Sequence, residues 1–268
     1  MRLAWLTDIH LNFLTPTDRR AFAATVAATG ADGVVITGDI AEAASVEPAL
    51  DELAEVVGRP VWFVLGNHDF YGGSVGGVRE RARRLTGRHP WLRWLPACGP
   101  VRLGDRLALV GHDGWGDARL GRGAESPVEL SDFFLIEDLV QRPARRTAVL
   151  RTLGDDAAAH LARDVADALR WARHVLVATH VPPFRDACWH EGRISDDDWL
   201  PFFTCAAAGD ALRAAMAARP DAAMTVLCGH THGAGEAMIL ANLRVWTGGA
   251  DYGAPVVQGV IETEALGA

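Results

Sequence analysis

The chain has 268 residues, of which 49% are hydrophobic and 22% are charged, and its formal net charge at pH 7 is −8. This length allows one large domain that buries a core without disulfide or metal staples. The acidic balance argues against a protein that wraps nucleic acid by bulk electrostatics. No apolar run reaches the roughly 18 residues that a membrane-spanning helix needs.

The N-terminal residues Met1 to Asp8 are typical of a strand and not of a leader, because neither a long apolar stretch nor a small-residue cleavage site is present. The four cysteines form no C-x-x-C pair, which argues against a zinc ribbon or a redox motif. We therefore expect reduced thiols and a cytoplasmic protein.

Short apolar runs of about six residues, rich in Val, Leu and Ile, predict buried strands. They lie at 2–9, 33–40, 61–66, 106–111, 174–179, 224–228, 243–247 and 255–262. Helical patterns bounded by capping residues and glycines lie between them. They cover 16–29, 45–57, 75–86, 155–173 and 210–218.

The alternation of strands and helices in the first half predicts βαβ units. The closely spaced strands after residue 224 favour an antiparallel finish, and hence a mixed sheet or two packed sheets. Two irregular stretches, 114–150 and 182–206, interrupt this alternation and are predicted to be loop or helical insertions. We expect a single domain over residues 1–268.

Polar motifs stand where five of the predicted strands end. Carboxyl ends of strands gather ligand sites in α/β folds, so these motifs are expected to converge on one edge. The motifs are Asp8-Ile9-His10, Gly38-Asp39, Gly66-Asn67-His68-Asp69, Thr179-His180 and Gly229-His230-Thr231-His232.

The spacing within these motifs predicts paired ligands. Side chains at i and i+2 of an extended segment point the same way, so Asp8 pairs with His10, and His230 pairs with His232. Carboxylate, imidazole and amide ligands without a thiolate suit Mn, Fe or Zn. Two such divalent ions about 3.5–4 Å apart can hold a hydroxide and clamp a phosphoryl group for displacement.

This ordered set of motifs resembles that of the calcineurin-like metallophosphoesterases over residues 8–232. The resemblance implies a four-layer α/β/β/α sandwich of two mixed β-sheets flanked by helices. It also implies two divalent metal ions. Asp8, His10 and His232 would bind one of them.

By the same resemblance, Asn67, His180 and His230 would bind the second metal ion, and Asp39 would bridge the two. His68 would face the substrate, where it stabilises the phosphate or protonates the leaving oxygen as a general acid. Asp69 would orient His68.

The run after the second strand is Gly38-Asp39-Ile40-Ala41-Glu42-Ala43. It departs from the GDxxDRG pattern of the Ser/Thr protein phosphatases and lacks its arginine, which argues against that branch. The motifs are also similar to those of the bacterial cyclic-nucleotide phosphodiesterases, but this signature is common to the superfamily and does not fix the substrate.

Other residues of the irregular stretches and their borders are weaker candidates. His112, Trp115 and His190 are candidate substrate contacts, although a turn or packing role is an equal or better interpretation for each. Trp189 and Trp199 could stack on a nucleobase or cap a loop, and packing is favoured. Packing or solvated roles are also expected for His89, His160, His174, the arginines at 79, 81, 83, 84, 142, 145 and 146, and Asp196-Asp197-Asp198.

The function that follows from the resemblance is hydrolysis by a metal-bridging hydroxide of a small phosphomonoester or phosphodiester, such as a nucleotide or cyclic nucleotide. A non-catalytic scaffold with the same fold is one alternative, and the complete ligand set argues against it. A nuclease is another, and the acidic net charge argues against nucleic acid as a partner. The sequence does not indicate an oligomeric state.

Overall fold

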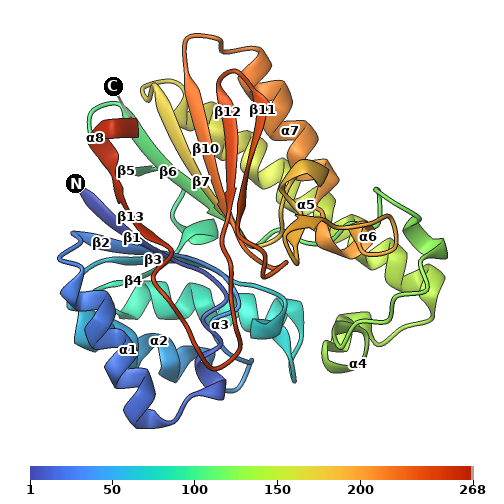
Figure 1. Cartoon of the computed structure of the whole chain (residues 1–268), viewed down its shortest axis with the longest axis horizontal. Coiled ribbons are helices and arrows are strands. Elements are labelled where there is room, and N and C mark those ends of the chain that lie inside the picture. Colours follow the sequence, from blue (N-terminus) through green and yellow to red (C-terminus); the bar gives the residue numbers. More distant parts are fainter. Residues whose placement is uncertain (267–268) are drawn as a thin grey trace.

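Two β-sheets pack face to face in the computed structural model, which describes residues 1–266 (Figure 1). The first sheet has the order β13-β1-β2-β3-β4. Its strands are β1 (Arg2–Leu6), β2 (Gly33–Thr37), β3 (Val61–Val64), β4 (Leu92–Trp94) and β13 (Gly259–Glu262). β1 to β4 are parallel to one another, and β13 is antiparallel to β1.

The second sheet has the order β11-β12-β10-β7-β6-β5. Its central strands β6, β7, β10 and β12 are parallel, and the edge strands β5 and β11 are antiparallel to their neighbours. The bounds are β5 (Val101–Arg102), β6 (Leu107–His112), β7 (His174–Thr179), β10 (Ala223–Cys228), β11 (Gly235–Leu240) and β12 (Leu243–Thr247).

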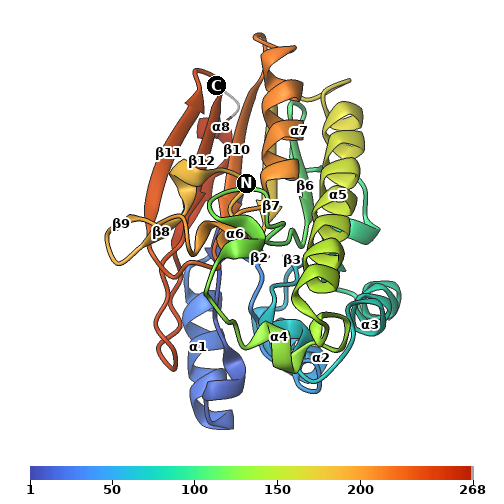
Figure 2. The ribbon, with the colours of Figure 1, turned by 90° about the vertical axis from the view of Figure 1, so that its right-hand side faces the viewer.

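Helices cover the outer face of each sheet. α1 (Pro16–Ala28), α2 (Val46–Val57) and α3 (Val75–Arg88) pack on the first sheet. α5 (Pro143–Ala168) and α7 (Ala206–Ala217) lie side by side on the second (Figure 2). The remaining short elements are α4 (Asp132–Leu135), α6 (Leu200–Phe203), α8 (Thr263–Leu266), β8 (Trp189–His190) and β9 (Arg193–Ile194).

The alternation of side chains along each strand explains the layers. In β1, Leu3 and Trp5 belong to the buried cluster between the two sheets, whereas Ala4 and Leu6 belong to the cluster under the helices. Successive side chains of a strand point to opposite faces, so a strand covered on both sides is apolar throughout. The predicted four-layer α/β/β/α sandwich is confirmed.

Several element predictions need correction. β1, β2 and β3 end two or three residues earlier than expected, because the chain turns before Asp8, Asp39 and Gly66, whereas β7 and β10 end at the predicted residues. β12 is parallel to β10, so the antiparallel finish applies only to β11 and β13. The strands β4, β5, β8, β9 and β11 were not predicted.

The helix predicted at 155–173 starts inside the first insertion. α5 begins at Pro143 and not at residue 155, so the end of the stretch 114–150 belongs to this helix. Proline is favoured at the first position of a helix, which explains the start. The stretch 182–206 is irregular apart from a 3-10 turn at Arg185–Ala187, β8, β9, α6 and the first residue of α7. Among the described residues, no helix combines the length and apolar character needed to cross a membrane.

Candidate metal centre

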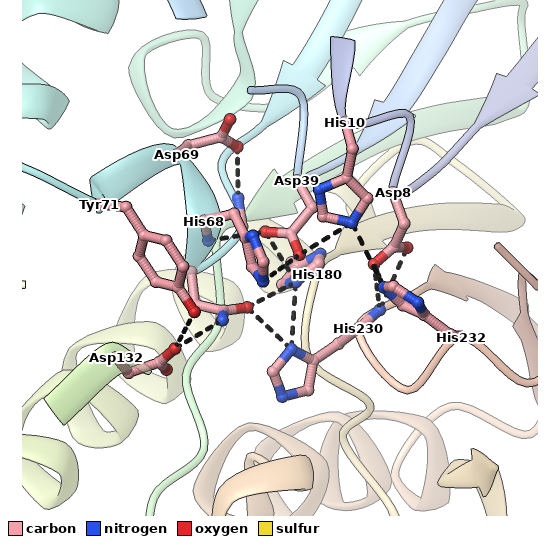
Figure 3. Close-up of polar contacts among 12 residues, drawn as sticks. Asp8, His10, Asp39, His68, Asp69, Tyr71, Asp132, His180, His230 and His232 are labelled. Atoms are coloured by element: carbon pink, nitrogen blue, oxygen red, sulfur yellow. Dashed lines mark hydrogen bonds and ion pairs between the residues drawn. The ribbon is translucent and has the colours of Figure 1, made fainter. Parts of the chain in front are cut away.

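The five motifs meet at the carboxyl ends of β1, β2, β3, β7 and β10 (Figure 3). The first three strands belong to one sheet and the last two to the other, so the site lies where the same edges of both sheets meet. Backbone hydrogen bonds join neighbouring loops, from the N–H of Asp8 to the carbonyl of Gly38 and from the N–H of Gly229 to that of His180. The predicted convergence is observed.

The motif residues adopt a strained backbone. Asp8, His10, Asp39, His230 and His232 all have a positive φ, which non-glycine residues seldom adopt. The backbone is therefore not extended between the paired ligands as the sequence argument assumed, although each pair does reach one place. Such conformations cost of order 1–3 kcal/mol each and persist at functional sites where the surroundings impose them.

The first donor group consists of Asp8, His10, Asp39 and His232, whose ligand atoms all lie within 4.8 Å of one another. Nε2 of His10 lies 3.3 Å from Nε2 of His232, and the latter atom lies 3.5 Å from Oδ1 of Asp8. Oδ2 of Asp39 lies 3.8 Å from Nε2 of His10. Two imidazole nitrogens and two carboxylates thus face one point.

The second donor group consists of Asn67, His180 and His230 with the other oxygen of Asp39. Oδ1 of Asn67 lies 2.9 Å from Nδ1 of His230 and 3.1 Å from Nε2 of His180. Oδ1 of Asp39 lies 3.4 Å from Nε2 of His180. Asp39 therefore presents one oxygen to each group, which is the arrangement expected of a bridging ligand.

The hydrogen bonds around the second group fix its atoms as acceptors. Nδ1 of His180 lies 2.8 Å from the carbonyl of Thr37, and Nε2 of His230 lies 3.1 Å from that of Phe202. Each carbonyl accepts from the ring nitrogen beside it, so in the neutral rings the lone pairs of the other nitrogens face inward together with Oδ1 of Asn67. Although burial opposes this, with no cation bound Asp39 raises the pKa of His180 to about 10, so metal binding must release that proton. Acceptors that converge on one point are stabilised by a cation, and the donor set fits a divalent metal.

Burial and charge set the protonation of the donors. Burial lowers the pKa of His10 to about 4, and burial together with His180 lowers that of His230 to about 3, so both rings are neutral and able to bind a metal. Although burial opposes ionisation of Asp39, His180 and His68 hold the pKa of this carboxyl well below its usual value. The bridge is therefore anionic.

Two glycines leave room for the bridging and terminal carboxylates. A Cβ at Gly66 would collide with the carboxylate of Asp39, and a Cβ at Gly229 would collide with that of Asp8. Both glycines lie in motifs at strand ends, where the backbone approaches the site closely.

His68 lies beside Asp39 and lines a cavity next to the two donor groups. Its Nε2 is 3.9 Å from Oδ2 of Asp39, and its ring stacks on Tyr71 with centroids 4.3 Å apart. The ring also meets His10 edge to face at 4.7 Å. Aromatic contacts on two sides therefore fix the orientation of His68.

Asp69 has a different role from the expected one. Its carboxylate accepts hydrogen bonds from the backbone N–H groups of Ile40, Ala41 and Gly66, at 2.8–2.9 Å. It thus ties the loop after β2 to the loop after β3 and holds Asp39 in place. Tyr71, and not Asp69, positions the His68 ring.

A cavity of about 300 Å³ opens in front of the donors. Of the three candidate substrate contacts, only His190 lines it. His112 is buried and accepts a hydrogen bond from the N–H of Gly114, and Trp115 is buried against Phe70 behind the second donor group. His112 and Trp115 are therefore packing residues and do not line the mouth of the site.

The sequence did not single out six residues of this cavity, Tyr71, Leu130, Ser131, Asp132, Phe203 and Tyr252. Oδ1 of Asp132 accepts hydrogen bonds from Nδ2 of Asn67 at 2.9 Å and from Oη of Tyr71 at 2.6 Å. Asp132 comes from α4 in the first insertion, and no spacing in the sequence links it to the motifs. Trp199, for which packing was favoured, also lines the cavity.

Most of the other residues named in the sequence analysis have packing or capping roles. His174 is buried with Nε2 2.9 Å from Oγ1 of Thr225, and His160 pairs with Asp164. Asp196 caps the turn before α6 by accepting the N–H groups of Asp198 and Trp199. Arg79 differs from the predicted solvated role.

Arg79 forms an ion pair of 2.9 Å with the buried Asp113. The same carboxylate accepts hydrogen bonds from the N–H of Leu65 and from Nε1 of Trp94. The pair therefore anchors α3 to the strand ends, and it faces away from solvent.

Solved structures with this fold include a hydrolase and a dimetal phosphatase. Phosphopantetheinyl hydrolase from Mycobacterium tuberculosis superposes with a TM-score of 0.65 at 18% identity, over 92% of this chain and 89% of that chain. A dimetal phosphatase from Danio rerio superposes with a TM-score of 0.57 at 13% identity, over 93% of this chain and 87% of that chain. No curated protein matches the sequence.

The family comparison covers most of the chain. The calcineurin-like phosphoesterase family matches residues 1–234, a range that contains all five motifs and every residue of both donor groups. The chain therefore belongs to the calcineurin-like phosphoesterases and is a metal-dependent phosphoester hydrolase.

Proposed function

We propose that this protein binds two divalent metal ions and hydrolyses a small phosphoester between them. The main support for the proposal is that the two oxygens of Asp39 face different donor groups. Oδ2 lies near His10, and Oδ1 lies near His180. An anionic bridge offsets the repulsion of two close cations.

The donor groups assign the ligands. Asp8, His10 and His232 would hold the first ion, and Asn67, His180 and His230 would hold the second. Their nitrogen and oxygen donors suit manganese, iron or zinc. When bound, such ions lower the pKa of water and neutralise negative charge on a phosphoryl group.

His68 is the general acid of the proposal. It lines the cavity beside the bridge and is held by Tyr71 and His10, so its ring can donate a proton to the leaving oxygen or a hydrogen bond to the phosphate. Because the ring is fixed by packing, no rearrangement is needed before it donates. Its Nε2 lies 3.9 Å from Oδ2 of Asp39, so the ring faces the proposed bridge.

The cavity supports a small-molecule substrate. Its volume of about 300 Å³ is at the lower end of the range for small-molecule pockets. The compounds to screen are a nucleotide, a cyclic nucleotide and a phosphopantetheinyl ester, the last because one structural neighbour is a phosphopantetheinyl hydrolase. A nuclease is disfavoured by the net charge of −8, and a scaffold by the completeness of both donor groups.

We also infer that residues 1–268 form a single domain in the cytoplasm. The family match ends at residue 234, but β11 and β12 extend the second sheet and β13 extends the first. The segment after the match therefore completes both sheets and does not start a separate unit. The cytoplasmic location is a prediction from the sequence.

The proposal is tested by metal content and turnover together. Protein stripped with a chelator should lose hydrolysis of p-nitrophenyl esters and regain it with Mn²⁺, with two ions bound per chain. Asp39→Asn should lose at least one ion and nearly all turnover, because the bridge carries the charge shared by both sites. The matched control is Asp105→Asn in an exposed turn. Full activity of Asp39→Asn would refute the proposal.

A further inference from the structure

We propose that the substrate is a phosphodiester with a single negative charge, which places one apolar or aromatic arm on each side of the metal centre. This inference rests on the proposed function and specifies its substrate class. It is drawn from the charge of the cavity wall and from the position of its aromatic side chains.

The cavity wall carries no permanent positive charge. All 26 basic residues of the chain are arginines, and none is among the described residues that line the cavity. Two arginines of the insertions are neutralised by aspartates, Arg122 by Asp198 at 3.2 Å and Arg185 by Asp197 at 2.9 Å. The wall does include the buried carboxyl group of Asp132.

This charge distribution selects between ester classes. A phosphomonoester carries between one and two negative charges near neutral pH, since its second pKa is about 6, whereas a diester carries one. Enzymes that bind a more highly charged phosphoryl group commonly add arginine or lysine clamps to the metal ions. A wall without such clamps suits the monoanionic diester and disfavours monoesters and polyphosphates.

Aromatic side chains flank the two donor groups on different sides. Near the second group, the Phe203 ring lies 5.1 Å from that of His230 and 5.1 Å from that of Trp199. Near the first group, the Tyr252 ring lies 4.6 Å from that of His10 and 5.0 Å from that of His232.

We call Trp199, Phe203 and His190 the Trp199 wall, and we call Tyr252 the Tyr252 wall. Trp199 and Tyr252 are 37% and 53% exposed, so both present ring surface to a ligand. Both lie among the residues that line the cavity. A phosphate that spans the two donor groups therefore directs its two ester arms at different aromatic walls.

The position of His68 assigns the arms. Its ring lies 6.1 Å from that of Tyr252 and 4.7 Å from that of His10. The leaving oxygen must face this proton donor, so the leaving arm lies on the Tyr252 wall and the retained arm on the Trp199 wall. Water adds to phosphorus, the bond to the leaving oxygen breaks, and one proton passes through His68 to that oxygen, which yields a monoester and an alcohol.

Three esters with the same p-nitrophenolate leaving group separate the effect of substrate charge from the effect of the retained ester arm. p-Nitrophenyl phosphate is a monoester, methyl p-nitrophenyl phosphate is a diester with a small arm, and bis(p-nitrophenyl) phosphate is a diester with an aromatic arm. The Mn²⁺-loaded protein should give kcat/KM values that rise in this order. Base-sized rings stacked on aromatic side chains contribute enough for a step of about tenfold between the two diesters.

Two variants test the Trp199 wall and the charge of the cavity wall. Trp199→Ala should lower kcat/KM for the bis ester several-fold more than for the methyl ester. Ser131→Arg places a cation at an exposed position of the cavity wall and should raise kcat/KM for the monoester relative to the methyl diester. The control is Trp91→Ala, an exposed tryptophan that precedes β4 at the opposite edge of the sheet.

The outcomes distinguish this inference from the proposed function. A monoester turned over faster than the methyl diester would overturn the inference and leave the proposed function standing. Equal loss for both diesters in Trp199→Ala would overturn the placement of the retained arm. Failure to hydrolyse any of the three esters with two Mn²⁺ ions bound would refute the proposed function, and the inference with it.

Discussion

The two donor groups of the metal centre are supported by different parts of the chain. The first group, Asp8, His10 and His232, is held by the loops after β1 and β10. The second group also depends on the insertions, because Asp132 of the first insertion accepts a hydrogen bond from Asn67 and the carbonyl of Phe202 in the second faces Nε2 of His230. The insertions thus orient two side chains of the second donor group.

This difference suggests how one ion can be adjusted without the other. The sheets and their loops fix the first group and the bridge, whereas changes in the insertions alter the geometry of the second group and the wall of the cavity. A substitution at Asp132 should therefore act on the second ion and on the substrate, and leave the first ion in place.

The largest expected effect is a loss of turnover without loss of either metal ion. His68→Ala should lower kcat by roughly 10²–10⁴-fold, the usual contribution of a general acid. Both ions should remain bound, because the group of side chains whose ligand atoms cluster within 4.8 Å includes His10 but not His68. Turnover and metal content are measured on the same preparation. Loss of a metal ion in this variant would show that His68 belongs to the donor set.

The next largest effect is a weaker affinity of the second donor group for its metal ion. Asp132→Ala removes the acceptor that orients the Asn67 amide, and such outer contacts typically change metal affinity by about 10–100-fold. The second Mn²⁺ should bind more weakly by that factor in a calorimetric titration, while the first binds as before. Tyr71→Phe, which removes only the hydroxyl partner, should have a smaller effect. Equal weakening of both ions would contradict the division of labour.

A smaller effect concerns the scaffold at the other end of the second sheet. Burial and Arg244 lower the pKa of His174 to about 4, whereas an unfolded histidine titrates near 6.5. The unfolded chain therefore binds the extra proton first, and stability present above pH 6.5 is lost as the pH falls toward 4.

Between pH 6.5 and pH 5 this loss amounts to about 2 kcal/mol in the free energy of unfolding. Denaturant titrations of metal-stripped wild type and His174→Gln measure it, and the variant should show the weaker dependence over this range. The same slope in both proteins would assign the acid sensitivity to other groups. The metal centre does not enter this comparison, because His174 lies at the start of β7, away from the donors.

The sequence predicts the ligands better than their surroundings for a physical reason. Asp39 and His180 directly follow apolar strands, and parallel strands bring their carboxyl ends to one edge, so local pattern and topology suffice to place them. Asp132 and Phe203 lie in irregular insertions whose path depends on tertiary packing. Nothing in their spacing indicates that they face the metal centre.

Two errors show the same limit. Asp69 follows His68 directly, and adjacency suggested a side-chain contact, but the carboxylate turns toward three backbone N–H groups of neighbouring loops. His112 ends a strand as the ligands do, yet its ring is buried beside His160 under α5. Position at a strand end indicates candidates, and packing decides which of them reach the cavity.

The most direct test of the two-group metal centre is a crystal structure of the Mn²⁺-loaded protein with anomalous diffraction from manganese. Two anomalous peaks should appear about 3.5–4 Å apart, one between Asp8, His10 and His232 and the other between Asn67, His180 and His230, with an oxygen of Asp39 bound to each ion. A single peak, or two peaks with Asp39 bound to only one ion, would contradict the account.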